Sequence, residues 1–101
     1  MYIINQTLLI EDSILAEWLD WIKLVYIPEV MASGFFSSHK MLKLIEGGTG
    51  EGSTFALQFM LHSEKYKKDA IVNFEVKYEW LISDTFGTKV LFFRTLLEDV
   101  S

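Results

Sequence analysis

The sequence predicts a ferredoxin-like α+β domain with the element order βαββαβ, in which two helices cover one face of a four-stranded antiparallel sheet. Two observations carry this prediction. Two amphipathic helical segments each stand between strand-like stretches, and a glycine-rich connection separates the two middle stretches. We expect a single domain over residues 1–101, because a chain of 101 residues has room for one hydrophobic core.

The first predicted strand runs from Tyr2 to Leu9. Its residues favour β-structure, and Asn5 and Thr7 alternate with Ile4 and Leu8. Successive side chains of a strand point to opposite faces of the sheet. The two polar side chains should therefore lie on the face opposite the two apolar ones.

The first predicted helix is the longest periodic segment of the chain. Its apolar residues recur at steps of three and four, which places them on one side of an α-helix: Ile14, Trp18, Trp21, Ile22 and Val25. Asp12 or Ser13 can cap its first N–H groups. Because Pro28 lacks an N–H and clashes with the preceding turn, we expect the helix to kink or end near Ile27. A short last turn follows, with Gly34 as its C-cap.

Two further strands are predicted, joined by the connection Gly47–Gly52. Phe35–Glu46 alternates loosely. Alternation places one set of its side chains on one face of the sheet and a second set on the other: Phe36, Leu42 and Leu44, and His39, Met41, Lys43 and Ile45. Thr54–His62 alternates cleanly. One of its faces carries Phe55, Leu57, Phe59 and Leu61, and the other carries Thr54, Ala56, Gln58, Met60 and His62.

The second predicted helix starts at Glu64, where Ser63 can cap it, and continues through Ile82. The β-branched residues in its middle weaken the helical preference there. We assign Trp80, like the two tryptophans of the first helix, to core or helix packing. A turn over residues 85–88 leads to the final strand, Lys89–Leu97.

Hydrophobic residues make up 50% of the chain and aromatic residues 15%. A domain of this size leaves much of its surface exposed, so this composition favours a surface that associates with itself. The face without helices is expected to show Ala56, Met60, Met41, Ile45 and Phe93. We predict a homodimer that packs two such faces together and leaves a cavity between the sheets. A tightly packed monomer with a few exposed aromatic side chains is the alternative.

Charge and residue types narrow the function classes. The net charge is −5 and the longest basic cluster is Lys65, Lys67 and Lys68, which argues against nucleic-acid binding. Without cysteine there is no disulfide, thiol nucleophile or cysteine-based zinc site. The first residues lack the pattern of a signal peptide, and no apolar run reaches membrane-spanning length, so we expect a cytoplasmic protein without a membrane partner.

Three segments resemble a small bacterial family of unassigned function, domain of unknown function 4286. They are Glu17–Lys23 with Tyr26–Met31 and Gly34; Gly52–Phe59; and the C-terminal Lys89-Val90, Phe93 and Thr95–Glu98. The segment Tyr66–Ser83 shows no shared signature. The resemblance implies a fold of the dimeric α+β barrel type, and it implies no activity.

The candidate ligand-binding residues are polar side chains expected on or near the open side of the sheet: Asn5, Thr7, His39, Lys43, Gln58, Arg94 and Thr95. Gln58 is an uncharged amide within an apolar strand, and Asn5 or Thr95 could satisfy it. We favour a structural hydrogen-bond network at the interface, rather than a bound ligand, as the partner of Gln58. Arg94 suggests a carboxylate clamp, although an intersubunit or surface ion pair is the commoner use of such a residue.

The sequence gives weaker support for a phosphate site or a metal site. The Gly47–Gly52 stretch lacks the Gly-Lys-Ser/Thr ending of a P-loop and opens no helix, which favours a mobile hairpin loop over a phosphate site. His39 and His62, without an ordered carboxylate nearby, make a poor metal site, so no metal is expected.

Two function classes stay open. The first is a small binding or interaction module without a cofactor, whose intersubunit cavity takes a small apolar or mixed ligand or whose surface binds a partner. The alternative is an enzyme similar to the cofactor-independent monooxygenases or haem-degrading enzymes built on this barrel type. Asn5 and Trp80 would suit the haem-degrading kind. The second helix contains no histidine, however, which argues against haem chemistry.

Overall fold

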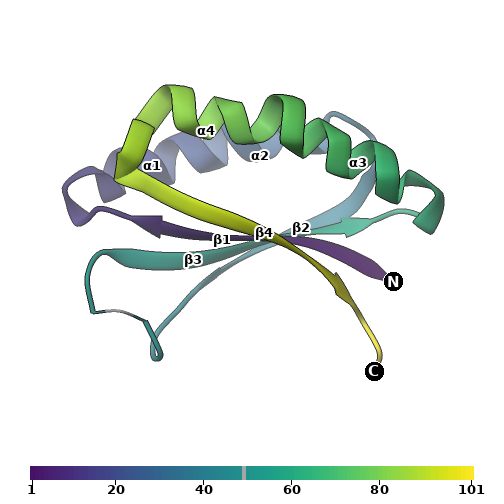
Figure 1. Ribbon diagram of the computed structural model, residues 1–101, viewed down its shortest axis with the longest axis horizontal. Coiled ribbons are helices and arrows are strands. Elements are labelled where there is room, and N and C mark those ends of the chain that lie inside the picture. The colour runs from purple at the N-terminus through teal and green to yellow at the C-terminus, as the bar shows by residue number, and fades with distance from the viewer. Residues whose placement is uncertain (49) are drawn as a thin grey trace.

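The computed structural model describes residues 1–48 and 50–101 and contains one four-stranded sheet. Its strands are β1 (Tyr2–Ile10), β2 (Phe36–Lys43), β3 (Ser53–Leu61) and β4 (Val90–Glu98). They lie in the order β2-β3-β1-β4, and every neighbouring pair is antiparallel. This is the predicted ferredoxin-like arrangement, with the strands on either side of the central pair coming from opposite halves of the chain (Figure 1).

Two interrupted helices cover one face of the sheet (Figure 1). The first consists of a 3₁₀ turn (Asp12–Ile14), α1 (Leu15–Trp21), a π-helical turn (Ile22–Tyr26) and α2 (Ile27–Met31). The second consists of a 3₁₀ turn (Glu64–Tyr66), α3 (Lys67–Asn73), a π-helical turn (Phe74–Tyr78) and α4 (Glu79–Phe86). A 3₁₀ turn (Gly87–Lys89) leads into β4.

The first helix does not end near Ile27, which was one of the two outcomes expected there. A π-helical turn interrupts its regular pattern just before Ile27, and the chain then continues through Pro28 as a short last segment that ends at Met31. Pro28 lies in the first turn of α2, where its fixed φ is compatible with helical backbone. The π-helical turn directly before it carries a hydrogen bond from the Ile27 N–H to the Ile22 carbonyl. This widened turn accommodates the proline ring within a continuous helix. Gly34, with φ +81°, then turns the chain into β2.

The helices bury a largely aromatic core against the sheet. Trp18 is fully buried, with its ring centroid 5.0 Å from that of Phe55. Phe74 contacts Phe59 and Tyr78, at 5.7 and 5.1 Å between ring centroids. Trp80, which the pattern assigned to packing, is 62% exposed on α4, so that assignment is wrong.

A β-bulge at Ser37 decides which side chains of β2 face the helices. Phe36 pairs with Leu61 and Ser38 with Met60, so one extra residue stands on β2 between two neighbouring positions of β3. Phe36 is buried beneath the helices, and the bulge reverses the parity of every later residue in the strand. The simple alternation predicted from the sequence is therefore wrong beyond Phe36.

Candidate functional site: the open face of the sheet

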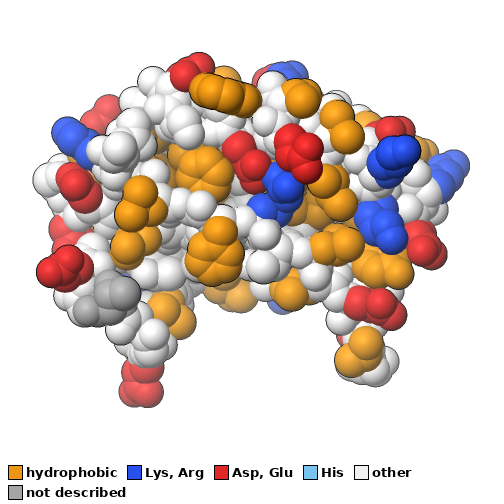
Figure 2. Space-filling view, in the orientation of Figure 1, with side chains coloured by type: hydrophobic (Ala, Val, Ile, Leu, Met, Phe, Trp, Pro, Cys, Tyr) orange, Lys and Arg blue, Asp and Glu red, His pale blue; other side chains and the backbone are white. Residues whose placement is uncertain are grey.

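The candidate site is the sheet face that the helices leave uncovered, called the open face here. Cross-strand partners share a face, so the register assigns its members. They are Ile3, Asn5, Thr7 and Leu9 of β1; Ser38, Lys40 and Leu42 of β2; Thr54, Ala56, Gln58 and Met60 of β3; and Leu91, Phe93, Thr95 and Leu97 of β4. The β2–β3 connection and the C-terminal end project away from the helices, so this face is hollowed (Figures 1 and 2).

A row of polar residues crosses the middle of the open face on all four strands, in the order Lys40, Gln58, Asn5 and Thr95. We call these residues the polar row. Asn5 Nδ2 donates to Thr95 Oγ1 and to Thr7 Oγ1, both at 3.2 Å. Gln58 Nε2 donates to Asn5 Oδ1 at 3.3 Å. The predicted partnership of Gln58 with Asn5 is thus confirmed.

Apolar side chains flank the polar row and are exposed in the single chain. Phe93 is 60% exposed, Leu91 57% and Leu42 46%. Single exposed apolar residues are ordinary, whereas a contiguous exposed patch marks a binding or interaction surface. Ala56, Met60 and Phe93 lie on this face as predicted.

One end of the open face is hollowed into a mostly apolar pocket of 280 Å³. Its lining consists of Thr7, Leu42, Leu44, Thr54 and Ala56, together with Lys43 and Phe55 from the adjacent helix-side positions. Thr7 also accepts the hydrogen bond from Asn5, so the pocket borders the polar row directly. A small ligand could therefore touch apolar and polar groups at once.

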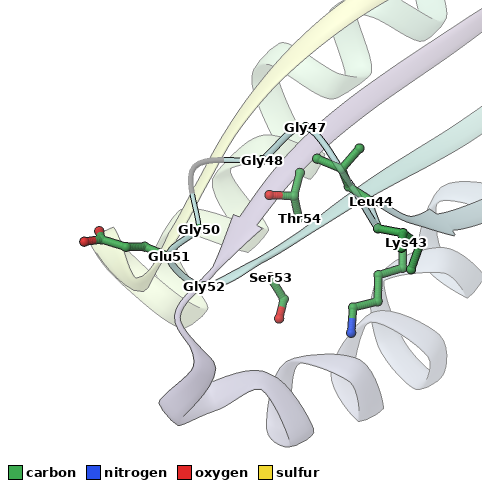
Figure 3. A pocket seen from close by; sticks show the side chains of 10 residues that line it. Lys43, Leu44, Gly47, Gly48, Gly50, Glu51, Gly52, Ser53 and Thr54 are labelled. Atoms are coloured by element: carbon green, nitrogen blue, oxygen red, sulfur yellow. The ribbon is translucent and has the colours of Figure 1, made fainter.

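The structure places His39 and Lys43 on the helix side of β2, not on the open face as expected. They pair with Phe59 and Phe55, both core residues, and the bulge at Ser37 is the cause. Figure 3 shows the side chain of Lys43 pointing to the helical side, opposite to Leu44. Met41 also lies on the helix side, opposite Leu57.

Lys40 is the residue that sequence reasoning missed. It takes the place expected for its two neighbours and pairs with Gln58 on the open face. Within the four strands that the structure describes, it is the only charged residue on this face. Lys40 lies on the open face only because of the bulge, and the residue types of β2 do not predict a bulge there.

Arg94 faces the helices and does not form a ligand clamp on the open face. Its guanidinium donates to Glu79 Oε1 at 2.7 Å and to Glu75 Oε1 at 3.2 Å. The side chain of Arg94 is 22% exposed and that of Glu79 19%. These contacts attach β4 to the second helix, so Arg94 serves in structural ion pairs.

A second buried polar contact lies under the helices. The Tyr26 hydroxyl donates to Gln6 Oε1 at 2.8 Å, and both side chains are fully buried. Burial raises the pKa of Tyr26 well above its usual value, because the charged phenolate is disfavoured away from water. Gln6 Nε2 has no hydrogen-bond partner among the described residues. This pair is separated from the open face by the sheet itself.

The connection between β2 and β3 forms another hollow, of 350 Å³. Its wall includes Lys43, Leu44, Glu51, Ser53 and Thr54, together with Gly47, Gly48, Gly50 and Gly52 (Figure 3). Thr49 of the predicted glycine-rich loop lies outside the described residues. The segment joins two antiparallel strands and precedes no helix, so it lacks the geometry of a phosphate-binding loop.

The residues that would suit haem degradation are not brought together. Asn5 lies on the open face, whereas Trp80 lies on α4 across the sheet. Among the described residues, no three His, Cys, Asp or Glu side chains gather into a possible metal site. In the same part of the chain, no helix is long and apolar enough to cross a membrane.

Several solved structures share this fold. An ethyl tert-butyl ether d (EthD) family protein from Bacillus halodurans C-125 superposes with a TM-score of 0.70 at 13% identity, covering 99% of this chain and 100% of that chain. A dimeric ferredoxin-like protein from an uncultured marine organism gives 0.68 at 11% identity, covering 99% and 95%. An EthD-like protein from Ralstonia eutropha JMP134 gives 0.60 at 14% identity, covering 98% and 93%.

These likenesses establish the fold, ferredoxin-like with EthD-like neighbours. No curated protein matches the sequence. The model of one family, Domain of unknown function (DUF4286), matches residues 1–100, nearly the whole chain. The resemblance noted in the sequence is thereby confirmed, and the chain belongs to the DUF4286 family.

Proposed function

We propose that the protein is a small cytoplasmic homodimer in which two open faces pack together and enclose a cavity that binds a small molecule. The observation that carries this proposal is the set of exposed apolar side chains that flank the polar row. They include Phe93, Leu91 and Leu42. A second copy of the same face would remove this surface from water, as isologous interfaces do.

The character of the open face suits self-association. Its strand residues carry only one charged side chain, so two copies meet without extensive like-charge repulsion. The hydroxyls and amides of the polar row can donate and accept across a two-fold axis. One structural neighbour is described as a dimeric ferredoxin-like protein, which supports the same assembly here. A chain without cysteine also needs no oxidising compartment to fold.

Binding is favoured over the alternative, a cofactor-independent monooxygenase-like activity. The polar row offers amides, a hydroxyl and an ammonium group, and these groups orient a ligand rather than supply a poised general base. No carboxylate or histidine stands on the open face within the four described strands. We therefore assign the cavity to recognition.

The test is the mass in solution of the full chain and of two matched variants. Phe93→Lys changes an aromatic side chain that is 60% exposed on the open face, and Trp80→Lys changes one that is 62% exposed on α4. An aromatic side chain can bury roughly 150–250 Å², so the exposed part of Phe93 contributes about 2–4 kcal/mol per copy at ~25 cal/mol/Å². Removing it from both copies should weaken the dimer by roughly a thousandfold or more.

Light scattering at micromolar concentration should therefore give a dimer for the wild type and for Trp80→Lys, and a monomer for Phe93→Lys. Far-UV circular dichroism should show the same helix content in all three proteins. A wild-type mass of one chain would overturn the proposal. Dissociation by Trp80→Lys, with Phe93→Lys still dimeric, would place the interface on the helices instead.

A further inference from the structure

We propose that the ligand of the cavity is a small amphipathic organic anion, a carboxylate carrying a short apolar chain. Lys40 and the polar row bind its carboxylate, and the pocket beside Thr7 takes its chain. This inference rests on the proposed dimer, since a second copy is what encloses the site. Three features of the open face support it.

The first feature is the hydrogen-bond balance of the polar row. Both N–H groups of Asn5 are used by Thr7 and Thr95, and Asn5 Oδ1 accepts from Gln58. Each hydroxyl that accepts a hydrogen bond keeps its own O–H for donation. Among the described residues no partner receives these two O–H groups or the second N–H of Gln58. The row thus presents free donors, which suits a ligand rich in acceptors.

The second feature is the uncompensated charge of Lys40. It pairs in register with Gln58, whose side chain starts the network, and it makes no ion pair among the described residues. No carboxylate stands on the open face of the four strands. Covering this face with a second copy would bring two ammonium groups toward one interface. A buried or partly buried charge requires a counter-charge, and an anionic ligand supplies one.

The third feature is the apolar pocket next to the donors. Its volume of 280 Å³ is near the lower end of ligand sites, at roughly 300–1,000 Å³, before a partner adds its own wall. Leu42 lies two residues from Lys40 on the same face and lines this pocket, while Thr7 joins it to Asn5. A ligand with its head on the polar row therefore has an apolar space for its chain. This arrangement selects amphiphiles over inorganic anions.

The experiment compares two probes of the same chain length, hexanoate and 1-hexanol, by calorimetric titration of the full chain at neutral pH. Lys40→Gln removes the charge on the open face. Lys23→Gln removes an exposed charge from the first helix, on the opposite side of the sheet, and serves as the matched control. We expect the wild type and Lys23→Gln to bind hexanoate about tenfold or more tightly than 1-hexanol, as a charge-assisted hydrogen bond implies. In Lys40→Gln most of this preference should be lost, with only the neutral donors of the polar row remaining.

Two results would overturn this inference while leaving the dimer intact. Either the wild-type dimer binds both probes equally, or Lys23→Gln loses the preference as fully as Lys40→Gln. A dimer weakened by Lys40→Gln, without a preference for hexanoate in the wild type, would assign Lys40 to an intersubunit ion pair and also overturn it. A wild-type mass of one chain is a separate outcome, because it overturns the proposed function itself.

Discussion

Replacing the buried Tyr26–Gln6 pair should change stability in a strongly non-additive way. The Tyr26 hydroxyl donates to Gln6 Oε1 at 2.8 Å, and neither side chain has any exposed surface. Gln6 Nε2 already lacks a hydrogen-bond partner among the described residues. The wild type thus contains one hydrogen bond and one unsatisfied amide group in the same buried place.

The expected magnitudes follow from counting unsatisfied groups. Tyr26→Phe leaves both polar atoms of the Gln6 amide unsatisfied and should destabilise the fold by about 1–3 kcal/mol. Gln6→Met removes the amide but leaves the tyrosine hydroxyl without its acceptor, so its net effect should be small. The double variant removes every unsatisfied group and should be at least as stable as the wild type.

The assay is urea unfolding followed by tryptophan fluorescence, with all four proteins at one fixed concentration, because a dimer's stability depends on concentration. In a domain of this size, 1 kcal/mol corresponds to roughly 4–8 °C in Tm, so thermal unfolding gives an independent check. If the two single effects simply add in the double variant, or if Tyr26→Phe is neutral, the account of this buried pair is refuted.

Two further predictions concern a glycine and the response to alkaline pH. Gly52→Ala should destabilise the fold more than Gly47→Ala. Both glycines have positive φ, but a Cβ on Gly52 would lie 2.6 Å from the Ile10 carbonyl oxygen, whereas one on Gly47 meets no atom within 4 Å. Equal losses in thermal unfolding would contradict this contact. Burial raises the pKa of Tyr26 in the folded protein, so its contribution to stability is fully present below the unfolded pKa of about 10 and is lost as pH rises above it. Relative to Tyr26→Phe, the wild type should therefore lose about 1.4 kcal/mol per pH unit above about pH 10 in urea unfolding, and a constant difference between the two proteins would be the contrary result.

Alternation along the strands predicted the open face well wherever the strand is regular. Asn5 and Thr7 on β1 and Gln58 on β3 lie where period-two alternation puts them, and the predicted link between Gln58 and Asn5 is present. The same argument failed on β2, because one inserted residue at Ser37 reverses the parity of a whole strand. The alternation argument therefore placed Lys43, rather than Lys40, on the open face.

Near Ile27, where a kink or an end of the first helix was expected, the structure has a π-helical turn and no helix end. Proline ends a regular α-helix because of its missing N–H and its ring, and the sequence alone gave no sign that a π-helical turn would precede Pro28. The same kind of turn occurs in the second helix without any proline, so no residue type marks it. Trp80 was assigned to packing by its size, yet its position on α4 leaves it exposed.

The central claim is that a second copy of the chain covers the open face, and native mass spectrometry of the freshly purified full chain tests it most directly. The account predicts a dimer at micromolar concentration. Extra mass on this dimer that disappears on denaturation would be the ligand of the cavity, and its value would give the ligand's size. A spectrum containing only the mass of one chain would contradict the account.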